Sequence, residues 1–308
     1  MLLFLIQNNF KPALIFAIEE EFYISYSKTK VKNYNFANLK NIAEQYHIPY
    51  FPVDSVKGKR LIDFANIIKK MNLDLLLVLG WYYMIPRSIR NLTKLGAWGI
   101  HASLLPNYSG GAPLVWAIIN GEKETGVTLF RMDDGVDDGD IIAQKSFPIY
   151  FEDTIREVYQ KAIDASKNIL FSSLNEFENV TFTPQDKSIT RVYPQRKPED
   201  GVINWKNNAL SIYNFIRAQT IPYPCAISYF QNIEIKIVDS KIIEINSQDY
   251  ECGTVVNINN KACVSTKDKF LEIGGIIYED KRYKFSDFSR TFKLWGGCSR
   301  AKNLKMAA

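Results

Sequence analysis

Apolar runs of strand length alternate with helical patterns through the first 150 residues of the chain. A continuous apolar run lies at 13–18, and further strands are expected at 48–53, 73–80, 97–102, 126–132 and 141–149. Helices are expected from Asn35, as N-cap, to Tyr46, and over 59–71, 112–121 and 153–178. This alternation predicts βαβ units and a mostly parallel sheet that helices cover on both faces. Ligands of such sheets bind at the carboxyl ends of the strands.

The sequence pattern changes near Tyr193. A polar, proline-bounded stretch at 194–201 indicates a linker, and 207–219 has the spacing of one helix. Beyond it, short alternating runs separated by turn residues are typical of a small antiparallel barrel. Because 308 residues exceed what one core usually holds, two domains are expected. We predict a Rossmann-like α/β domain at 1–190 and a C-terminal, OB-like β-barrel domain at 191–308.

The N-terminus departs from this scheme. A doubly wound domain opens with a strand, a tight turn and a first helix. Only residues 1–12 precede the run at 13–18, and 1–11 resemble the end of that first helix. We therefore favour a chain from which strand one and its turn are missing. The alternative is that 1–6 are themselves the strand.

Composition excludes several classes of protein. The chain is 46% hydrophobic and 23% charged, which excludes a disordered or fibrous protein. No apolar run approaches the roughly 20 residues of a membrane-spanning helix, and the N-terminus lacks the basic leader of a signal peptide. The four cysteines lie far apart and only two histidines are present. This pattern argues against a zinc site or another structural metal and predicts a cytoplasmic location.

Charge is distributed unevenly along the chain. Residues 190–308 hold 18 Lys and Arg against 12 Asp and Glu, a net charge of +6, whereas the remainder is close to neutral. A basic domain beside a neutral one fits a polyanionic or phosphorylated substrate. The alternative is a solvated, lysine-rich surface, because the basic residues form no block.

The segment 99–140 gathers the residues that carry chemistry. His101 ends an apolar strand and precedes a loop rich in Gly, Pro and Ser, so it is a candidate acid or base. The alternative is a structural histidine. A second strand runs into five aspartates interleaved with Gly135 and Gly139, without the spacing of a calcium loop. We expect one of these aspartates to orient the His101 imidazole and raise its basicity.

This segment resembles the signature of 10-formyltetrahydrofolate-dependent formyltransferases, in which Asn-x-His-x-Ser-Leu-Leu-Pro precedes an Asp-x-Gly motif. GIHASLLP at 99–106 and DDG at 137–139 carry the resemblance. Further similar stretches, in the same order as in the family, lie at 75–86, 196–205 and 214–228. The family includes methionyl-tRNA formyltransferase, sugar N-formyltransferases and the formyltransferase half of the enzyme that modifies aminoarabinose in polymyxin resistance. The resemblance covers nearly the whole chain.

The resemblance implies roles at the reacting centre. His101 matches the catalytic histidine, Asp137 matches the catalytic aspartate, and Ser103 lies in the loop beneath the formyl group. Gly99 stands where the family has the asparagine that helps to hold the formyl oxygen. Loss of one such donor costs about 10²–10³ in rate, unless a backbone N–H, a water or another side chain replaces it.

The resemblance also implies binding residues. The expected co-substrate is 10-formyltetrahydrofolate, and no metal is required. Its pterin is expected in an apolar slot beside the acidic loop, whose members are Leu79, Gly80, Trp81, Tyr82, Tyr83, Met84, Ile85, Asp133, Gly135 and Asp140. Contacts to the amine substrate are expected from Leu104, Pro106, Tyr108 and Gly110. The alternative for the aromatic run is that it belongs to the core.

The implied reaction is acylation of a neutral primary amine through a tetrahedral oxyanion. His101, held by Asp137, would take the proton from the amine or, when protonated, stabilise the oxyanion.

Two amine substrates compete. A tRNA substrate requires a basic insertion, whereas the segment after 13–18 offers Lys28, Lys30 and Lys32 behind three glutamates and holds no arginine. The stretch 110–132 is more similar to the sugar-modifying members. We favour a nucleotide-linked amino sugar, as in O-antigen or lipopolysaccharide building blocks. We expect no membrane partner, and a homodimer is one oligomeric state that the chain could adopt. The alternatives are methionyl-tRNA and a non-catalytic remnant that binds folate or nucleotide.

Overall fold

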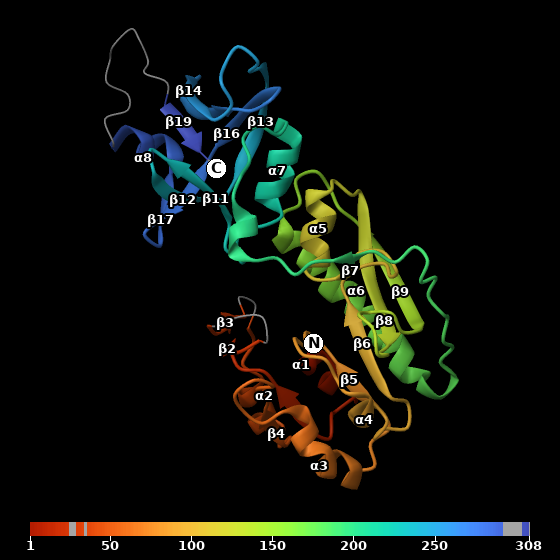
Figure 1. Cartoon of the computed structure of the whole chain (residues 1–308). Coiled ribbons are helices and arrows are strands. Elements are labelled where there is room, and N and C mark those ends of the chain that lie inside the picture. Colours follow the sequence, from red (N-terminus) through yellow and green to blue (C-terminus); the bar gives the residue numbers. More distant parts are fainter. Residues whose placement is uncertain (25–28, 34–35, 292–303, 308) are drawn as a thin grey trace. The chain divides into compact units, whose positions relative to one another are not determined.

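A computed structural model describes residues 1–24, 29–33, 36–291 and 304–307 of the chain. The chain divides into two compact units (Figure 1). The first holds Met1–Gly111, Thr125–Phe147 and Gln160–Tyr193, and the second holds Ala112–Glu124, Pro148–Tyr159 and Pro194–Ala308. The domain boundary expected at 190/191 stays a prediction.

The apolar runs of the first 150 residues form the strands of the first unit. The strands are β1 (Ile15–Ala17), β4 (Tyr50–Pro52), β5 (Leu76–Val78), β6 (Ala97–His101), β8 (Glu124–Arg131) and β9 (Ile141–Pro148). β1 is parallel to β4, β5 is parallel to β6, and β6 is antiparallel to β8. The order β5-β6-β8-β9 makes one sheet, and β1 with β4 makes another. Phe16 of β1 packs against the apolar cluster that includes Val78 of β5, so side chains join the two sheets.

Helices alternate with these strands, as the α/β prediction requires. They are α1 (Leu2–Gln7), α2 (Leu39–Gln45), α3 (Ala65–Lys70), α4 (Arg87–Arg90) and α6 (Ile155–Asn175), with a 3₁₀ turn at Leu61–Phe64 and another at Phe177–Asn179. α1 shows that the helical reading of the N-terminus is right and the strand alternative is wrong. α2 begins after Asn38, whose side chain accepts a hydrogen bond from the Lys40 N–H at 3.1 Å. The expected cap Asn35 lies outside the described residues.

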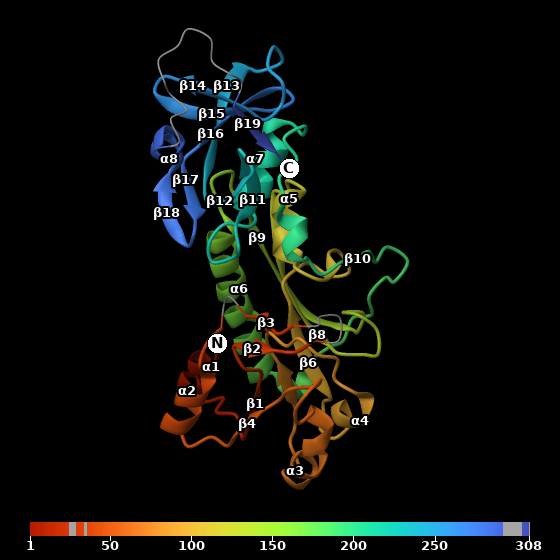
Figure 2. The same cartoon turned by 60° about the vertical axis from the view of Figure 1, so that its left-hand side comes forward.

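The second unit is rich in antiparallel strands, as predicted. Its elements are α5 (Pro113–Ile119), a 3₁₀ turn (Pro198–Gly201), α7 (Ala209–Arg217), β11 (Ala226–Phe230), β12 (Ile233–Ile237), β13 (Ser240–Asn246), β14 (Thr254–Ile258), β15 (Lys261–Ser265), β16 (Lys269–Ile273), β17 (Gly275–Tyr278), β18 (Lys281–Lys284), α8 (Phe285–Thr291) and β19 (Leu304–Ala307). The strand order is β13-β16-β15-β14-β19-β11-β12-β17-β18, and the hairpin β17–β18 is clear in Figure 2. Phe230, Leu271 and Phe285 lie in the buried core beneath these strands.

Of the helices in the described residues, none is long and apolar enough to cross a membrane.

Candidate functional site

The last residue of β6, His101, contacts an aspartate and a backbone carbonyl. Its Nδ1 lies 3.3 Å from Oδ2 of Asp137, and its Nε2 lies 2.8 Å from the carbonyl oxygen of Tyr108. The His101 side chain is 10% exposed, so protein contacts rather than water determine its orientation. A neutral imidazole has one N–H and donates to one of these acceptors, whereas an imidazolium donates to both. The surroundings of His101 therefore fix the ring and accommodate a proton that it takes up.

A glycine contacts the same Asp137 carboxylate oxygen that faces His101. Oδ2 of Asp137 accepts a hydrogen bond from the Gly110 N–H at 2.9 Å. Gly110 belongs to the short strand β7 (Ser109–Gly110), which pairs parallel with β10 (Val192–Tyr193). Its φ is +95°, and a side chain at 110 would collide with the Tyr193 carbonyl oxygen. Only glycine therefore combines this close pairing with the hydrogen bond to Asp137.

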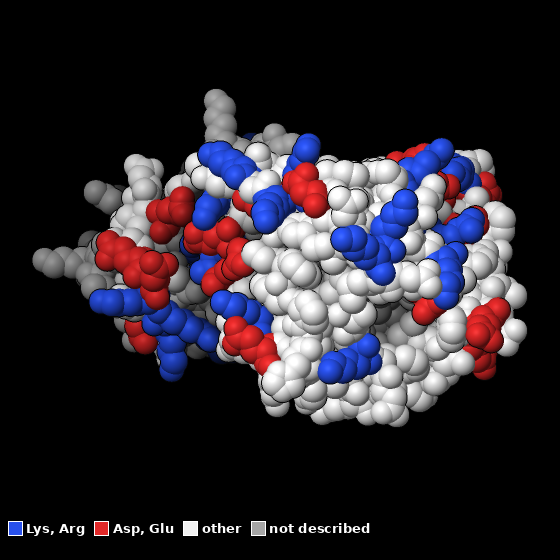
Figure 3. Space-filling view, turned by 90° about the horizontal axis from the view of Figure 1, so that it is seen from below, with Lys and Arg blue, Asp and Glu red and all other residues white. Residues whose placement is uncertain are grey.

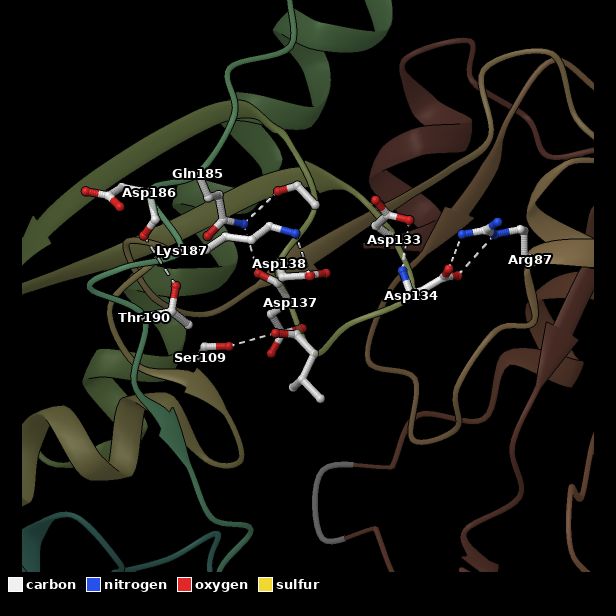
Figure 4. A network of polar contacts seen from close by, with 12 residues as sticks. Arg87, Ser109, Asp133, Asp134, Asp137, Asp138, Gln185, Asp186, Lys187 and Thr190 are labelled. Atoms are coloured by element: carbon white, nitrogen blue, oxygen red, sulfur yellow. Dashed lines mark hydrogen bonds and ion pairs between the residues drawn. The ribbon is translucent and has the colours of Figure 1, made fainter.

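The acidic loop at 133–140 is fastened at both ends (Figure 4). Arg87 and Arg90 of α4 both donate to the Asp134 carboxylate, and these bonds hold its pKa below the ordinary value. Arg90 is nearly buried, with 6% of its side chain exposed. At the other end, Nζ of Lys187 lies 2.9 Å from Oδ2 of Asp138. The loop that carries Asp137 is thus attached firmly at Asp134, through the nearly buried Arg90, and more weakly at Asp138, where solvent screens the ion pair.

The Gly99 position is closed by an aromatic ring. Gly99 pairs with Phe130 across β6 and β8, and His101 pairs with Thr128. Residues 99 and 101 share one face of the strand, because side chains alternate along it. A Cβ atom at 99 would lie 3.2 Å from Cε1 of Phe130, which is itself buried. A side chain at position 99 therefore requires the Phe130 ring to shift by a few tenths of an ångström.

The loop after His101 is held by internal hydrogen bonds. The buried Ser103 hydroxyl donates to the Asn107 carbonyl at 2.6 Å, and the Ser103 carbonyl accepts from the Thr128 hydroxyl at 2.7 Å. Tyr108 has φ +56° and stacks on Tyr193 with ring centroids 4.7 Å apart. This stack and the left-handed backbone turn the Tyr108 carbonyl towards His101.

The aromatic segment 79–85 follows β5. Val78 pairs with Gly99, so this segment begins at the same edge of the sheet as His101. Met84 is 63% exposed and Tyr82 is 46% exposed, whereas Ile85 is buried in the apolar cluster that also includes Val78. Nε1 of Trp81 is buried and has no hydrogen-bond partner among the described residues. Tyr83 donates to the Tyr23 carbonyl at 2.9 Å, and burial raises its pKa.

The structure brings some of the predicted site residues together and leaves others apart. It brings His101, Asp137, Tyr108 and Gly110 into contact through the pairs described above. Leu104 and Pro106 lie on the same loop, where Leu104 packs closely on Gly126. The other three predicted members of the acidic loop contact protein groups: Asp133 accepts from the Asp134 N–H, Asp140 pairs with Arg131 at 2.9 Å, and Gly135 abuts Asp138. The binding roles of all these residues stay predictions.

Sequence reasoning missed the residues that hold the loops. Tyr193 and Gln185 lie more than 40 residues beyond Asp137 in the chain, and neither belongs to a recognisable motif. The charge pattern could have revealed Arg87 and Arg90, because two arginines one helical turn apart match the adjacent aspartates 133 and 134. Within the described part of the chain, no three His, Cys, Asp or Glu side chains gather as a metal site.

Comparisons with known proteins show the family and the fold of the chain. Residues 27–174 match the family described as formyl transferase, and residues 196–293 match the formyl transferase C-terminal domain. A methionyl-tRNA formyltransferase of Thermodesulfovibrio yellowstonii is 32% identical over 83% of this chain and 81% of its own length. The bifunctional polymyxin resistance protein ArnA of Wigglesworthia glossinidia brevipalpis is 36% identical over 77% of this chain and 36% of its own length. The fold is similar to that of WlaRD, a sugar 3N-formyltransferase crystallised with dTDP and 5-N-formyl-THF, with a TM-score of 0.53, 23% identity, and 85% of this chain and 98% of that one covered.

Proposed function

Because the chain belongs to the 10-formyltetrahydrofolate-dependent formyltransferase family, we propose that it formylates the primary amine of a nucleotide-linked amino sugar. Folate-dependent formyl transfer is the activity of the family, and the choice of amine is the proposal. The observation that carries the choice of amine is the neutralised charge of the N-terminal hairpin, where Lys32 lies 3.3 Å from Glu20. The transfer itself is supported by the contact between His101 and Asp137, 3.3 Å between Nδ1 and Oδ2, which orients the imidazole to which we assign the general-base role.

His101 is the residue to which we assign proton transfer in this reaction. The amine nitrogen bonds to the formyl carbon, the bond from that carbon to the folate nitrogen breaks, and one proton passes from the amine to that folate nitrogen. We assign to His101 the relay of that proton from the amine to the folate nitrogen; Asp137 and the Tyr108 carbonyl lie within reach of the two N–H groups of its imidazolium form. The resulting positive charge also stabilises the negative charge that develops on the formyl oxygen. This second effect matters more here, since Gly99 has no side chain that could donate a hydrogen bond to the formyl oxygen.

The segment 79–85 fits the folate. The bound folate supplies the activated formyl group. Trp81 offers a buried indole N–H with no partner among the described residues, and the heteroatoms of a pteridine ring are acceptors. Tyr82 and Tyr83 both lie against Phe22, with ring centroids 4.7 and 6.0 Å away, so an aromatic wall adjoins this donor.

The charge of the N-terminal hairpin favours a small substrate. β2 (Glu21–Phe22) pairs with β3 (Val31–Lys32), and Lys32 forms an ion pair with Glu20 at 3.3 Å. The second hairpin lysine, Lys30, lies over the Tyr23 ring, and Lys28 is outside the described residues. On the face shown in Figure 3, Lys and Arg side chains are scattered among acidic and uncharged surface. A tRNA-binding surface instead needs a concentration of positive charge.

We place the activity in the cytoplasm, in keeping with free cysteines 225, 252 and 263.

A second candidate substrate is methionyl-tRNA. The observation that favours it is the 32% identity to a methionyl-tRNA formyltransferase over 81% of that protein. Both substrates present a primary amine, so the site described above is compatible with either.

The substrate is tested by offering 10-formyltetrahydrofolate with a panel of nucleotide-linked amino sugars, and separately with methionyl-tRNA. The products are identified by mass. A sugar nucleotide heavier by one formyl group, at a kcat/KM well above that for the tRNA, supports the proposal. A higher kcat/KM for methionyl-tRNA overturns it in favour of the second candidate.

A further inference from the structure

Gln185 contacts the loop that carries Asp137 from outside the catalytic motifs. Its Nε2 donates to the backbone carbonyl of Asp137 at 2.8 Å and to that of Gly139 at 2.6 Å (Figure 4). One amide nitrogen has two hydrogens, so both are used on carbonyls two residues apart. Gln185 therefore clamps the turn of the loop rather than a side chain on it.

The clamp acts where the backbone is strained. Asp137 has φ +53°, a left-handed conformation that costs energy for a residue with a side chain. A conformation of this kind persists only where surrounding contacts enforce it. From it, the Asp137 carboxylate reaches both the Gly110 N–H and His101. The position of the carboxylate thus depends on the turn that Gln185 holds.

Gln185 is itself firmly placed. Its side chain belongs to a residue that is 9% exposed, and its segment is anchored by a two-way hydrogen-bonded bridge between Thr183 and Ile141, 2.8 Å each way. Its Oε1 is buried and has no partner among the described residues. A buried unpaired acceptor is unfavourable, so the two bonds of Nε2 are what keep the side chain in this orientation.

We propose that Gln185 is a positioning residue for formyl transfer, which holds Asp137 in the conformation that places its carboxylate on His101. The effect of Gln185 on kcat rests on the proposed function, whereas its effect on the contact between Asp137 and His101 does not.

The structural consequence is tested by NMR of ¹⁵N-histidine-labelled protein. The chain has two histidines, His47 and His101, so His47 is an internal reference. The Asp137→Ala variant shows how the His101 ring nitrogens respond to loss of the carboxylate. In Gln185→Leu, which removes both donors, the His101 signals move towards those of Asp137→Ala while the His47 signals stay in place. Unchanged His101 signals in a folded Gln185→Leu protein overturn the proposal.

The matched control is Lys187→Ala. Lys187 also bonds to this loop, at Asp138, but its side chain is 64% exposed and the ion pair is screened by solvent. The Lys187→Ala variant is expected to leave the His101 signals unchanged. If Gln185→Leu does not fold, Gln185→Asn, which keeps the amide but withdraws it by one methylene, replaces it and is read in the same way.

The kinetic consequence is tested by a double-mutant cycle. Gln185→Leu lowers kcat about 100-fold, as expected when a catalytic group is displaced. In the Asp137→Ala background the same substitution lowers kcat no further, because the group that it positions is gone. Equal losses in both backgrounds, with the folded protein intact, overturn the proposal. Since the NMR comparison needs no substrate, it stands even if the parent protein formylates neither amine.

Discussion

Gly99 of β6 lies directly opposite Phe130 of β8, and the Phe130 ring closes the space in which a side chain at position 99 would project beside His101. The loss of the family's asparagine is therefore accompanied by an aromatic ring, which donates no hydrogen bond. Whatever holds the formyl oxygen in this protein is not an amide at position 99.

Restoring the asparagine tests this relationship. Gly99→Asn is expected to lower the free energy of unfolding by about 1–3 kcal/mol, because the new side chain overpacks a region where Phe130 is 3% exposed. Urea denaturation measures the loss. In Gly99→Asn/Phe130→Ala the two substitutions couple favourably, since the shortened residue makes room for the amide. Additive losses, or a Gly99→Asn variant as stable as the parent, would contradict the described packing.

At Gly110, an added methyl group tests the close pairing of β7 with β10. Gly110→Ala introduces a collision with the Tyr193 carbonyl at φ +95° and is expected to destabilise the protein by about 1–3 kcal/mol. It also lowers kcat, because the N–H donated to Asp137 moves. Gly96→Ala is the control: φ is +72° there, yet nothing lies within 4 Å of the added atom. Its loss is expected to be smaller and to leave kcat unchanged. Equal effects of the two substitutions would argue against the close pairing of β7 with β10.

The ion pairs of Asp134 predict a pH dependence of stability. Hydrogen bonds from Arg87 and then Arg90 lower the pKa of Asp134 below its ordinary value of 3.8. The folded state therefore favours the ionised Asp134 carboxylate more than the unfolded state does. The resulting contribution to the free energy of unfolding is present above pH 3.8 and is lost as pH falls through the lowered pKa. Asp134→Asn should be less stable than the parent near pH 7, and the difference should shrink in acid. Unfolding free energies from pH 7 down to pH 3 measure this, and a difference that stays constant with pH would exclude it.

The strands and the place of His101 at the end of one of them could be predicted from the sequence, because they depend on local patterns. Continuous apolar runs mark β5 and β6, and His101 follows from its place at a strand end. The choice of Asp137 among five aspartates needed the family resemblance. No local pattern reveals it, since the conformation of the loop is imposed by Gln185 and by Tyr193 through Gly110, both distant in sequence. The replacement of Asn by Gly at 99 was visible, but its partner Phe130 follows only from the pairing of β6 with β8.

The most direct test of the account is the rate of formyl transfer from 10-formyltetrahydrofolate to the accepted amine by the parent protein, His101→Ala, Asp137→Asn and His47→Ala. His47→Ala is the matched control, because it removes the only other histidine. We expect kcat to fall about 10²–10⁴-fold in the first two variants and to stay at the parent level in the third. Formyl transfer that continues at the parent rate without His101 or Asp137, in folded protein, would contradict the central claim.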